Sequence, residues 1–266
     1  MKKLLIIKLG GSVITYKDSP TPKARLDTIK RLAKEIAQIY QQNKYQLILV
    51  HGAGSFGHPI AKKYNLHQGM KTKQQELAFS LMDQQMIELN SIIIQALLKN
   101  NLPAISLPPR SFVQQSAGKF AGFDSQIIKN CLDQNQIPVL FGDGVLDDKW
   151  GCSIISGDTI VSYLAQKLHT HQVIFLSDVD GIYTSDPKTD QTAKLIPEIS
   201  NKNFNKVIKG LTPTKRHDVT GEMQGKIISL QRGLKDVPVA IVNGLKAKTL
   251  QQVLMQASTG TKLLLN

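Results

Sequence analysis

Short apolar runs alternate along this chain with longer amphipathic stretches, and this alternation restricts the fold more than any other feature. Residues 4–9, 46–50 and 173–176 have the length and composition of buried strands. Residues 23–42 and 73–100 instead carry apolar side chains at helical spacing. Strands that alternate with helices form a mostly parallel sheet with helices on both faces, so we predict an α/β fold, a three-layer αβα sandwich.

The same patterns cover the rest of the chain. They predict one domain over residues 1–266, with an N-terminal lobe of about 1–170 and a C-terminal lobe of about 171–266. Turn residues predict β-hairpins around 111–122 and 144–155, added at one edge of the sheet. The predicted helices are 23–42, 73–100, 125–134, 157–168, 225–234 and 249–257, and the predicted strands are 4–9, 46–50, 103–107, 138–141, 173–176, 239–242 and 261–265.

The charge of the chain suits an anionic partner. It carries 33 basic and 20 acidic residues, a net charge of +13. The lysines are scattered and aromatic residues make up only 6% of the chain, so we expect neither a nucleic-acid nor a membrane partner. Cys131 and Cys152 fit no metal motif or disulfide framework, and no segment resembles a signal peptide or a membrane span. We therefore expect a cytoplasmic protein.

Glycines follow several predicted strands, where ligands of such sheets bind. At the first of these junctions, Lys8 precedes Gly10 and Gly11. Paired glycines let backbone N–H groups approach an anion, and Lys17 offers a second positive charge nearby. Taken alone, a glycine turn beside a half-buried lysine explains this junction equally well.

The second junction, residues 51–58, contains GAGSFG, which has the spacing of a dinucleotide-binding loop. Such a loop requires an acidic residue about 20 positions further on to hold the ribose. Lys71 and Lys73 stand there instead, so the dinucleotide interpretation fails. We favour a helix N-terminus that binds another anion, with His58 as a ligand rather than a capping or packing residue.

Two further junctions carry acidic residues. Gly157 lies at a predicted helix start, where Ser156 or Asp158 could be an ordinary N-cap. Asp178 and Asp180 follow a strongly apolar strand and could pair with a ribose, bind Mg²⁺ through water, or form an Asx-rich turn. The chain has no complete Walker A motif and no G-x-S-x-G motif, so it matches neither a P-loop enzyme nor an α/β-hydrolase.

Together these segments resemble the amino acid kinase superfamily. The resemblance rests on KLGGS at 8–12, the glycine loop at 51–58, SGD at 156–158, SDVDGIYTSDP at 177–187 and DVTGEMQGK at 218–226, in the family's order. Within the superfamily, His58 and the PIAKKY that follows it are similar to the isopentenyl phosphate kinases. The resemblance implies transfer of the γ-phosphoryl group of ATP to isopentenyl phosphate in isoprenoid biosynthesis, giving isopentenyl diphosphate and ADP.

The resemblance also implies roles for individual residues. The N-terminal lobe would bind the acceptor and the C-terminal lobe the nucleotide, in a homodimer that uses ATP with Mg²⁺ as the nucleotide complex and holds no metal of its own. The catalytic residues would be Lys8, Lys17 and His58. The acceptor phosphate would lie among Ala53, Gly54, His58 and Gly157, and ATP would contact Lys8, Gly10, Gly11, Ser12, Gly54, Asp178 and Lys226.

Several features are open to more than one interpretation. Phe79, Met82 and Met86 lie at helical spacing and form either part of the core or a pocket for a short branched tail. Ala53 and Glu222 stand where relatives commonly have glycine. Ala53 is tolerated there if its φ is negative, whereas the carboxylate of Glu222 would repel ATP.

Two other functions compete with the one that the resemblance implies. The first is a kinase of another small anionic acceptor, such as fosfomycin, a carboxylate or a carbamate. The second is a binder of nucleotides or nucleic acid that has lost catalysis, which the charge of +13 favours. The sequence does not distinguish isopentenyl from dimethylallyl phosphate or longer acceptors.

Overall fold

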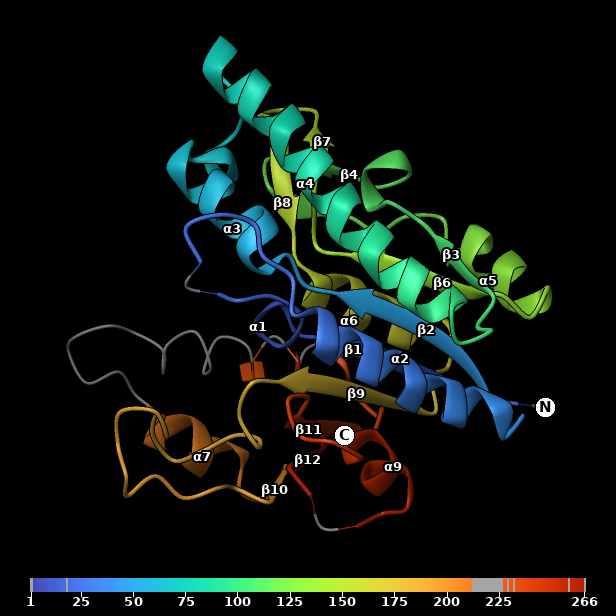
Figure 1. Cartoon of the computed structure of the whole chain (residues 1–266). Coiled ribbons are helices and arrows are strands. Elements are labelled where there is room, and N and C mark those ends of the chain that lie inside the picture. The colour runs from blue at the N-terminus through green and yellow to red at the C-terminus, as the bar shows by residue number, and fades with distance from the viewer. Residues whose placement is uncertain are drawn as a thin grey trace.

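The computed structural model describes residues 2–17, 19–211, 227–228, 230–231, 233–257 and 259–265. Within them, the main sheet has the strand order β10-β12-β11-β9-β1-β2-β6-β3 (Figure 1). Only the β11–β12 pair is antiparallel among the paired neighbours of this described sheet. These strands are β1 (Lys3–Leu9), β2 (Tyr45–His51), β3 (Ala104–Ser106), β6 (Ile137–Phe141), β9 (Gln172–Ser177), β10 (Glu198–Ser200), β11 (Val239–Asn243) and β12 (Thr261–Leu264).

Helices cover both faces of this sheet, which confirms the predicted αβα sandwich. In Figure 1, α2 and α4 lie in front of the central strands and α6 lies behind them. The helices are α1 (Gly11–Ile14), α2 (Leu26–Gln41), α3 (Gly54–Lys63), α4 (Lys73–Leu98), α5 (Gln126–Asp133), α6 (Gly157–Lys167), α7 (Phe204–Gly210) and α9 (Thr249–Leu254).

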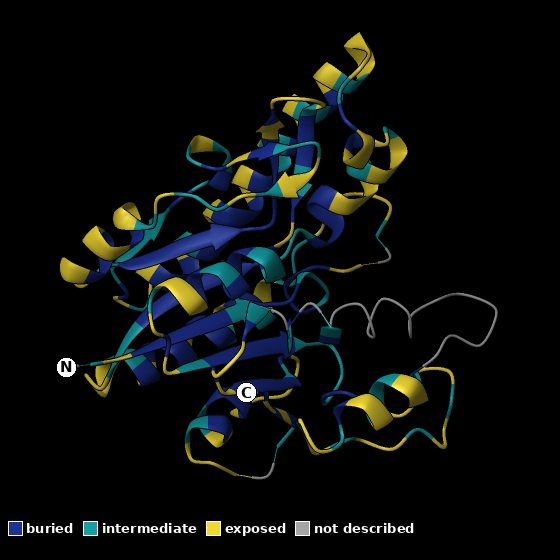
Figure 2. Cartoon of the chain, turned by 180° about the vertical axis from the view of Figure 1, so that it is seen from behind, coloured by how far each residue is buried: buried dark blue, intermediate teal, exposed yellow. Residues whose placement is uncertain are grey.

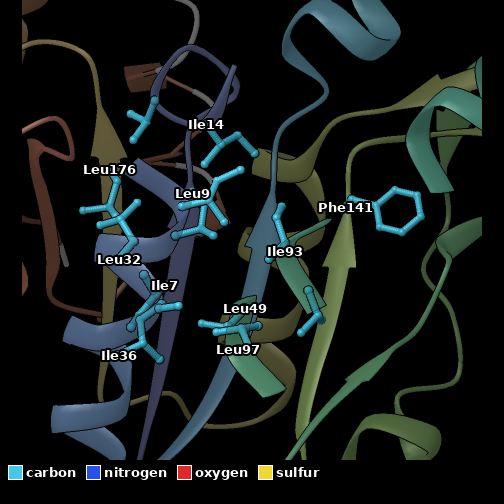
Figure 3. Close-up of a cluster of buried hydrophobic side chains, with 14 of the residues drawn as sticks. Ile7, Leu9, Ile14, Leu32, Ile36, Leu49, Ile93, Leu97, Phe141 and Leu176 are labelled. Atoms are coloured by element: carbon cyan, nitrogen blue, oxygen red, sulfur yellow. The ribbon is translucent and has the colours of Figure 1, made fainter. Parts of the chain in front are cut away.

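The alternation of side chains along β1 creates two cores. Ile7 and Leu9 pack with Leu32 and Ile36 of α2 (Figure 3). Ile6, which precedes Ile7, belongs to the second core, together with residues of α5 and α6. Successive side chains of a strand point to opposite faces, so a sheet buried on both faces needs apolar residues at nearly every position. Figure 2 shows the result, with buried residues along the central strands and exposed ones on the outer surfaces of the helices.

The two predicted hairpins form, but they pair with each other in a separate sheet of order β5-β4-β7-β8. The carboxylate of Asp147 joins the hairpins, since it accepts hydrogen bonds from the backbone N–H groups of Ala117 and Gly118. The main sheet therefore gains no strand from them at its edge. The strands are β4 (Gln114–Ser116), β5 (Lys119–Phe120), β7 (Asp143–Asp147) and β8 (Gly151–Ile155).

Helix α4 connects the two sheets. Thr72 caps its N-terminus by accepting a hydrogen bond from the backbone N–H of Gln75. In Figure 1 its first turns extend beyond the main sheet, beside the smaller one. A Cβ added to Gly144 of β7 would lie 2.3 Å from the Met82 methyl carbon and 2.7 Å from the Phe79 ring, so α4 packs closely on β7.

The predicted elements agree with the structure, apart from boundaries, wherever it describes them. Of the predicted helix 225–234, the described residues 227–228, 230–231 and 233 are helical, Leu234 lies in a bend, and the others lie outside the described residues. The sequence patterns did not predict β10 and α7. No helix among the described residues is long and apolar enough to cross a membrane.

Candidate active site

The glycine junctions after β1 and β2 lie directly against each other. The Gly10 N–H donates to the Leu176 carbonyl at 3.0 Å, and the Gly52 N–H donates to the Leu9 carbonyl at 2.9 Å. A Cβ on Gly11 would lie 2.6 Å from the Gly54 nitrogen, and one on Gly52 would lie 2.7 Å from the Gly11 nitrogen. These positions must therefore be glycine for the two backbones to pack closely, whether or not a ligand binds there.

The residues around the turn into α3 differ in what they require of the backbone. Gly54 has φ +52°, and an added Cβ would lie 2.0 Å from Thr15 Oγ1. Ala53 has φ −77° and ψ −37°, which an L-amino acid adopts without strain. Ala53 therefore has the negative φ that lets alanine stand where relatives commonly have glycine.

These junctions open onto a pocket of about 200 Å³ at the carboxyl ends of the strands. Predicted site residues from distant parts of the chain line it, among them Lys8, His58 and Gly157. Met82 and Met86 of α4 and Ile154 of β8 give it an apolar side. The complete lining is Lys8, Gly11, Gly52, Ala53, Gly57, His58, Ala61, Met82, Met86, Gly142, Asp143, Gly144, Ile154, Ile155, Ser156, Gly157 and Asp158.

Lys8 is held at the pocket by Asp158. Lys8 Nζ lies 3.0 Å from Asp158 Oδ1, and the Lys8 side chain is only 12% exposed. Ser156 is the N-cap of α6, because its hydroxyl accepts from the Thr159 N–H at 3.0 Å. Ser156, rather than Asp158, is therefore the N-cap of α6. The N-terminus of α6 and the Lys8 ammonium both give this side of the pocket positive potential.

The other predicted site residues occupy different places. His58, in α3, is exposed at the mouth of the pocket, whereas Gly54 is buried and is not among the lining residues. Lys17 is exposed on the segment after α1 and is likewise not among them. Ser12 is hydrogen-bonded to Asp178. Lys226 and Glu222 lie outside the described residues.

A second polar cluster lies at the ends of β9 and β11. Asp178 pairs with Lys188, and Asp180 accepts from Lys246 and, at 3.0 Å, from Asn243 Nδ2. Burial acts to raise the pKa of Asp178, but the Lys188 ammonium and the Ser12 hydroxyl hold it below its ordinary value. The hydrogen bond from Lys246 lowers the pKa of Asp180. Both side chains are therefore carboxylates at neutral pH.

A histidine that the sequence patterns did not single out lies behind the glycine loop. His51 is fully buried, stacks on Phe141, and has its Nδ1 3.1 Å from the Gly52 carbonyl. A carbonyl only accepts, so Nδ1 carries the proton and Nε2 accepts from Asn90 Nδ2 at 3.2 Å. Burial lowers the pKa of His51 to about 4, so the ring is neutral and fixes the loop to α4.

A partly buried ion-pair network lies beside the pocket, which it joins through Asp143. The Arg110 guanidinium, which lies just before β4, bridges Asp143 of β7 and Asp83 of α4. Burial raises the pKa of Asp143 to about 6, against the influence of Arg110. Sequence reasoning missed this junction, although the glycines on either side of Asp143 mark a close turn between β6 and β7 and could have indicated it.

Comparison with known proteins agrees with the fold. The chain belongs to the amino acid kinase family, whose model matches residues 3–243. It is 37% identical to the isopentenyl phosphate kinase of Methanocaldococcus jannaschii over 267 residues, which cover 98% of each chain. It is 37% identical to that of Methanothermobacter thermautotrophicus over 233 residues, which cover 85% of each chain.

A solved structure gives the same result. A crystal structure of an isopentenyl phosphate kinase superposes with a TM-score of 0.84 at 32% identity, covering 98% of this chain and 100% of that one. The resemblance to the superfamily that the sequence motifs indicated is thereby confirmed. Its similarity to isopentenyl phosphate kinases in particular is confirmed as well.

Proposed function

We propose that this protein is a phosphotransferase that moves the γ-phosphoryl group of ATP to isopentenyl phosphate, giving isopentenyl diphosphate and ADP. The observation that carries the proposal is the pocket itself, in which Lys8, His58 and Gly157 line one side and methionines of α4 line another. This combination suits a small molecule with an anionic end and an apolar tail. Relatives named isopentenyl phosphate kinases, at 37% identity, support the choice of acceptor.

The acceptor phosphate would bind at the glycine loop. The N–H of Ala53 and the N-terminus of α6 would provide a backbone donor and positive potential, and His58 would provide a side-chain donor at the mouth. A phosphate monoester has a second pKa of about 6, so its oxygen is already a nucleophile near pH 7. No carboxylate is then required as a general base. In this scheme His58 orients the acceptor by donating a hydrogen bond to its phosphate.

Lys8 and Lys17 would stabilise the charge of the group in transit. Phosphoryl transfer depends mainly on positioning and on neutralisation of the phosphoryl oxygens. The ion pair with Asp158 holds the Lys8 ammonium beside both the glycine loop and the start of α6. Lys17 lies on the segment that follows Gly10 and Gly11, so it would approach the phosphates from the nucleotide side.

The nucleotide would occupy the ends of β1, β9 and β11. Gly10, Gly11 and Ser12 lie at the end of β1, and Asp178 at the end of β9 is hydrogen-bonded to Ser12. Lysines pair with the carboxylates there, so the cluster has cations available for a polyphosphate. Among the described residues, no three His, Cys, Asp or Glu side chains gather to hold a metal ion. As the family resemblance implies, Mg²⁺ would bind as the ATP complex, where it neutralises phosphate charge.

The isoprenoid tail would lie against α4. Met82 and Met86 are almost fully buried yet line the pocket, and Phe79 packs beside them on Gly144. Methionine side chains adapt to the shape of a short branched ligand. We further propose a cytoplasmic homodimer with an acceptor lobe of about residues 1–170 and a nucleotide lobe of about 171–266, as the family resemblance implies.

A panel of acceptors tests the proposal. Purified protein with ATP and Mg²⁺ is assayed for ADP release with isopentenyl phosphate, dimethylallyl phosphate, fosfomycin, glutamate, acetylglutamate and carbamate. We expect the highest kcat/KM with isopentenyl or dimethylallyl phosphate. Higher turnover of fosfomycin or of a carboxylate would contradict the proposed acceptor. Salt-dependent binding of RNA without turnover of any acceptor would contradict phosphotransfer altogether.

A further inference from the structure

Two buried hydroxyl groups connect the glycine loop with the segment that carries Lys17. Thr15 is 0% exposed and Ser55 is 2% exposed, although both are polar. The Ser55 N–H donates to Thr15 Oγ1 at 3.0 Å, and Thr15 Oγ1 donates to the Gly11 carbonyl at 2.8 Å. The Thr15 hydroxyl therefore joins the glycine turn after β1 to the start of α3.

The second hydroxyl extends this connection to the far end of the Lys17 segment. The Lys23 N–H donates to Ser55 Oγ at 3.1 Å. Lys23 in turn accepts at its carbonyl from the Tyr16 N–H at 2.9 Å, and Thr15 and Ala24 form an isolated β-bridge. Thr15 and Lys23 thus close the base of a loop, here called the lysine loop (residues 16–23), which contains Lys17.

Side chains at the base of the loop reinforce this closure. Arg25 Nε donates to the Thr15 carbonyl at 3.0 Å, and the Arg25 guanidinium lies 4.2 Å from the centre of the Tyr16 ring. The Lys23 ammonium lies 5.2 Å from the same ring. None of these contacts reaches α3. The hydroxyl groups of Thr15 and Ser55 instead carry the hydrogen bonds that link the described part of the loop with the glycine loop.

We infer that Thr15 and Ser55 are positioning residues that fix the lysine loop on the glycine loop, so that Lys17 is aligned with an acceptor bound there. The inference rests on the proposed function for the role of Lys17, but its geometric part does not. An exposed lysine has many rotamers, and a shift of about 1 Å in a group that acts on the transition state is enough to reduce turnover strongly. The base of the loop, rather than Lys17 itself, supplies the rigidity.

Loss of either hydroxyl leaves a donor without its acceptor. Ser55→Ala removes the acceptor of the Lys23 N–H, and Thr15→Val removes the acceptor of the Ser55 N–H while keeping the side-chain shape. Thr15→Ser keeps the hydroxyl and is the conservative variant. Ser80→Ala is the matched control, because the Ser80 hydroxyl is exposed on α4 and donates only to the Glu76 carbonyl in its own helix.

Amide hydrogen exchange tests the geometric part without any turnover. We expect Ser55→Ala and Thr15→Val to speed exchange of the Tyr16 and Lys23 amides roughly tenfold or more, with exchange in β1 and β2 unchanged. Thr15→Ser and Ser80→Ala should exchange like the wild type. Unchanged rates at Tyr16 and Lys23 in Ser55→Ala would overturn the inference. Faster exchange throughout β1 and β2 would do the same, since it would indicate a general loss of structure.

A double-mutant cycle with Lys17→Ala tests the positioning role. We expect Ser55→Ala to lower kcat roughly tenfold with little change in KM for ATP, and Thr15→Ser to recover most of the turnover that Thr15→Val loses. In the Lys17→Ala background, Ser55→Ala should cause no further fall in kcat. Equal falls in both backgrounds would overturn the inference. Wild-type protein without turnover of any acceptor would refute the proposed function instead, and the exchange rates would still decide whether the loop is anchored.

Discussion

Lys8 in β1 and Asp158 in the first turn of α6 form an ion pair with an Nζ–Oδ1 distance of 3.0 Å. The pair is largely buried, with 12% and 25% of the two side chains exposed. It brings together two motifs that are about 150 residues apart in the sequence. Lys8 shares a strand face with Leu4 and Ile6, so its side chain reaches α6 rather than α2 or α4.

Asp158→Asn removes the charge that holds Lys8. We expect kcat to fall about a hundredfold, because the ammonium is no longer fixed toward the group in transit. Steady-state kinetics with ATP and isopentenyl phosphate measure the effect. Asp27→Asn is the control, since Asp27 is fully exposed and its contact with Lys30 is 3.9 Å. If Asp158→Asn turned over like Asp27→Asn, the pair would have no part in positioning Lys8.

Gly54→Ala is expected to destabilise the protein. Gly54 has φ +52°, and the new Cβ would lie 2.0 Å from the Thr15 hydroxyl. Backbone strain and the clash together should lower the free energy of unfolding by at least about 2 kcal/mol. Gly210→Ala is the matched control, because nothing lies within 4 Å of its added Cβ and Gly210 ends a helix. Equal stability of the two variants in urea titrations would contradict the close packing of the glycine junctions.

Met86→Ala should change the preferred length of the acceptor. The Met86 side chain is 1% exposed and lines the apolar side of the pocket. Its loss should cost about 2–5 kcal/mol of stability and lengthen the pocket, so that kcat/KM shifts toward longer prenyl phosphates. Leu97→Ala, equally buried in the same helix but away from the pocket, should lose similar stability without the shift. A shift of equal size in both variants would show that the pocket does not hold the tail.

His51 should make stability depend on pH. Burial lowers its pKa to about 4 from the ordinary value of 6.5, so between these values the unfolded chain binds a proton that the folded protein does not. The contribution is fully present above pH 6.5 and is lost as the pH falls toward 4, by up to about 1.4 kcal/mol per pH unit.

The difference in unfolding free energy between the wild type and His51→Gln isolates this effect. The difference should shrink steadily as the pH is lowered from 7 to 4. The same substitution at exposed His67 controls for the chemical change. A difference that stays constant over this range would show that His51 is not held neutral in the folded protein.

Much of the fold follows from local patterns. Strands β1, β2 and β9 are buried on both faces of a parallel sheet. Such strands are apolar at nearly every position, so their sequences alone predict them. The sequence of helix α3 does not predict a helix, because GSFGHP combines two glycines with Pro59. Its helical state depends on packing against α4. The separate four-stranded sheet depends on pairing between two hairpins, β4 with β7, which no local pattern encodes.

The candidate site likewise contains residues that the local sequence predicted and residues that it did not. Glycine spacing and the final histidine of residues 51–58 predicted an anion loop, and the structure lines one pocket with Lys8, Ala53 and His58. Asp158 and Asp143 were not predicted as site residues. Asp158 follows a serine that satisfies the local capping pattern, and the partner of Asp143, Arg110, is 33 residues away. Contacts of this kind are fixed by topology rather than by the neighbouring residues.

The most direct test of the proposed function is a phosphorus-31 NMR measurement of the reaction products. Wild-type protein with ATP, Mg²⁺ and isopentenyl phosphate should replace the acceptor monophosphate signal by a diphosphate pair while ADP accumulates. His58→Ala should lose about a hundredfold in rate, and His67→Ala, which removes an exposed histidine outside the pocket, should not. An acceptor signal that persists with the wild type, or a His58→Ala variant as fast as His67→Ala, would contradict the proposal.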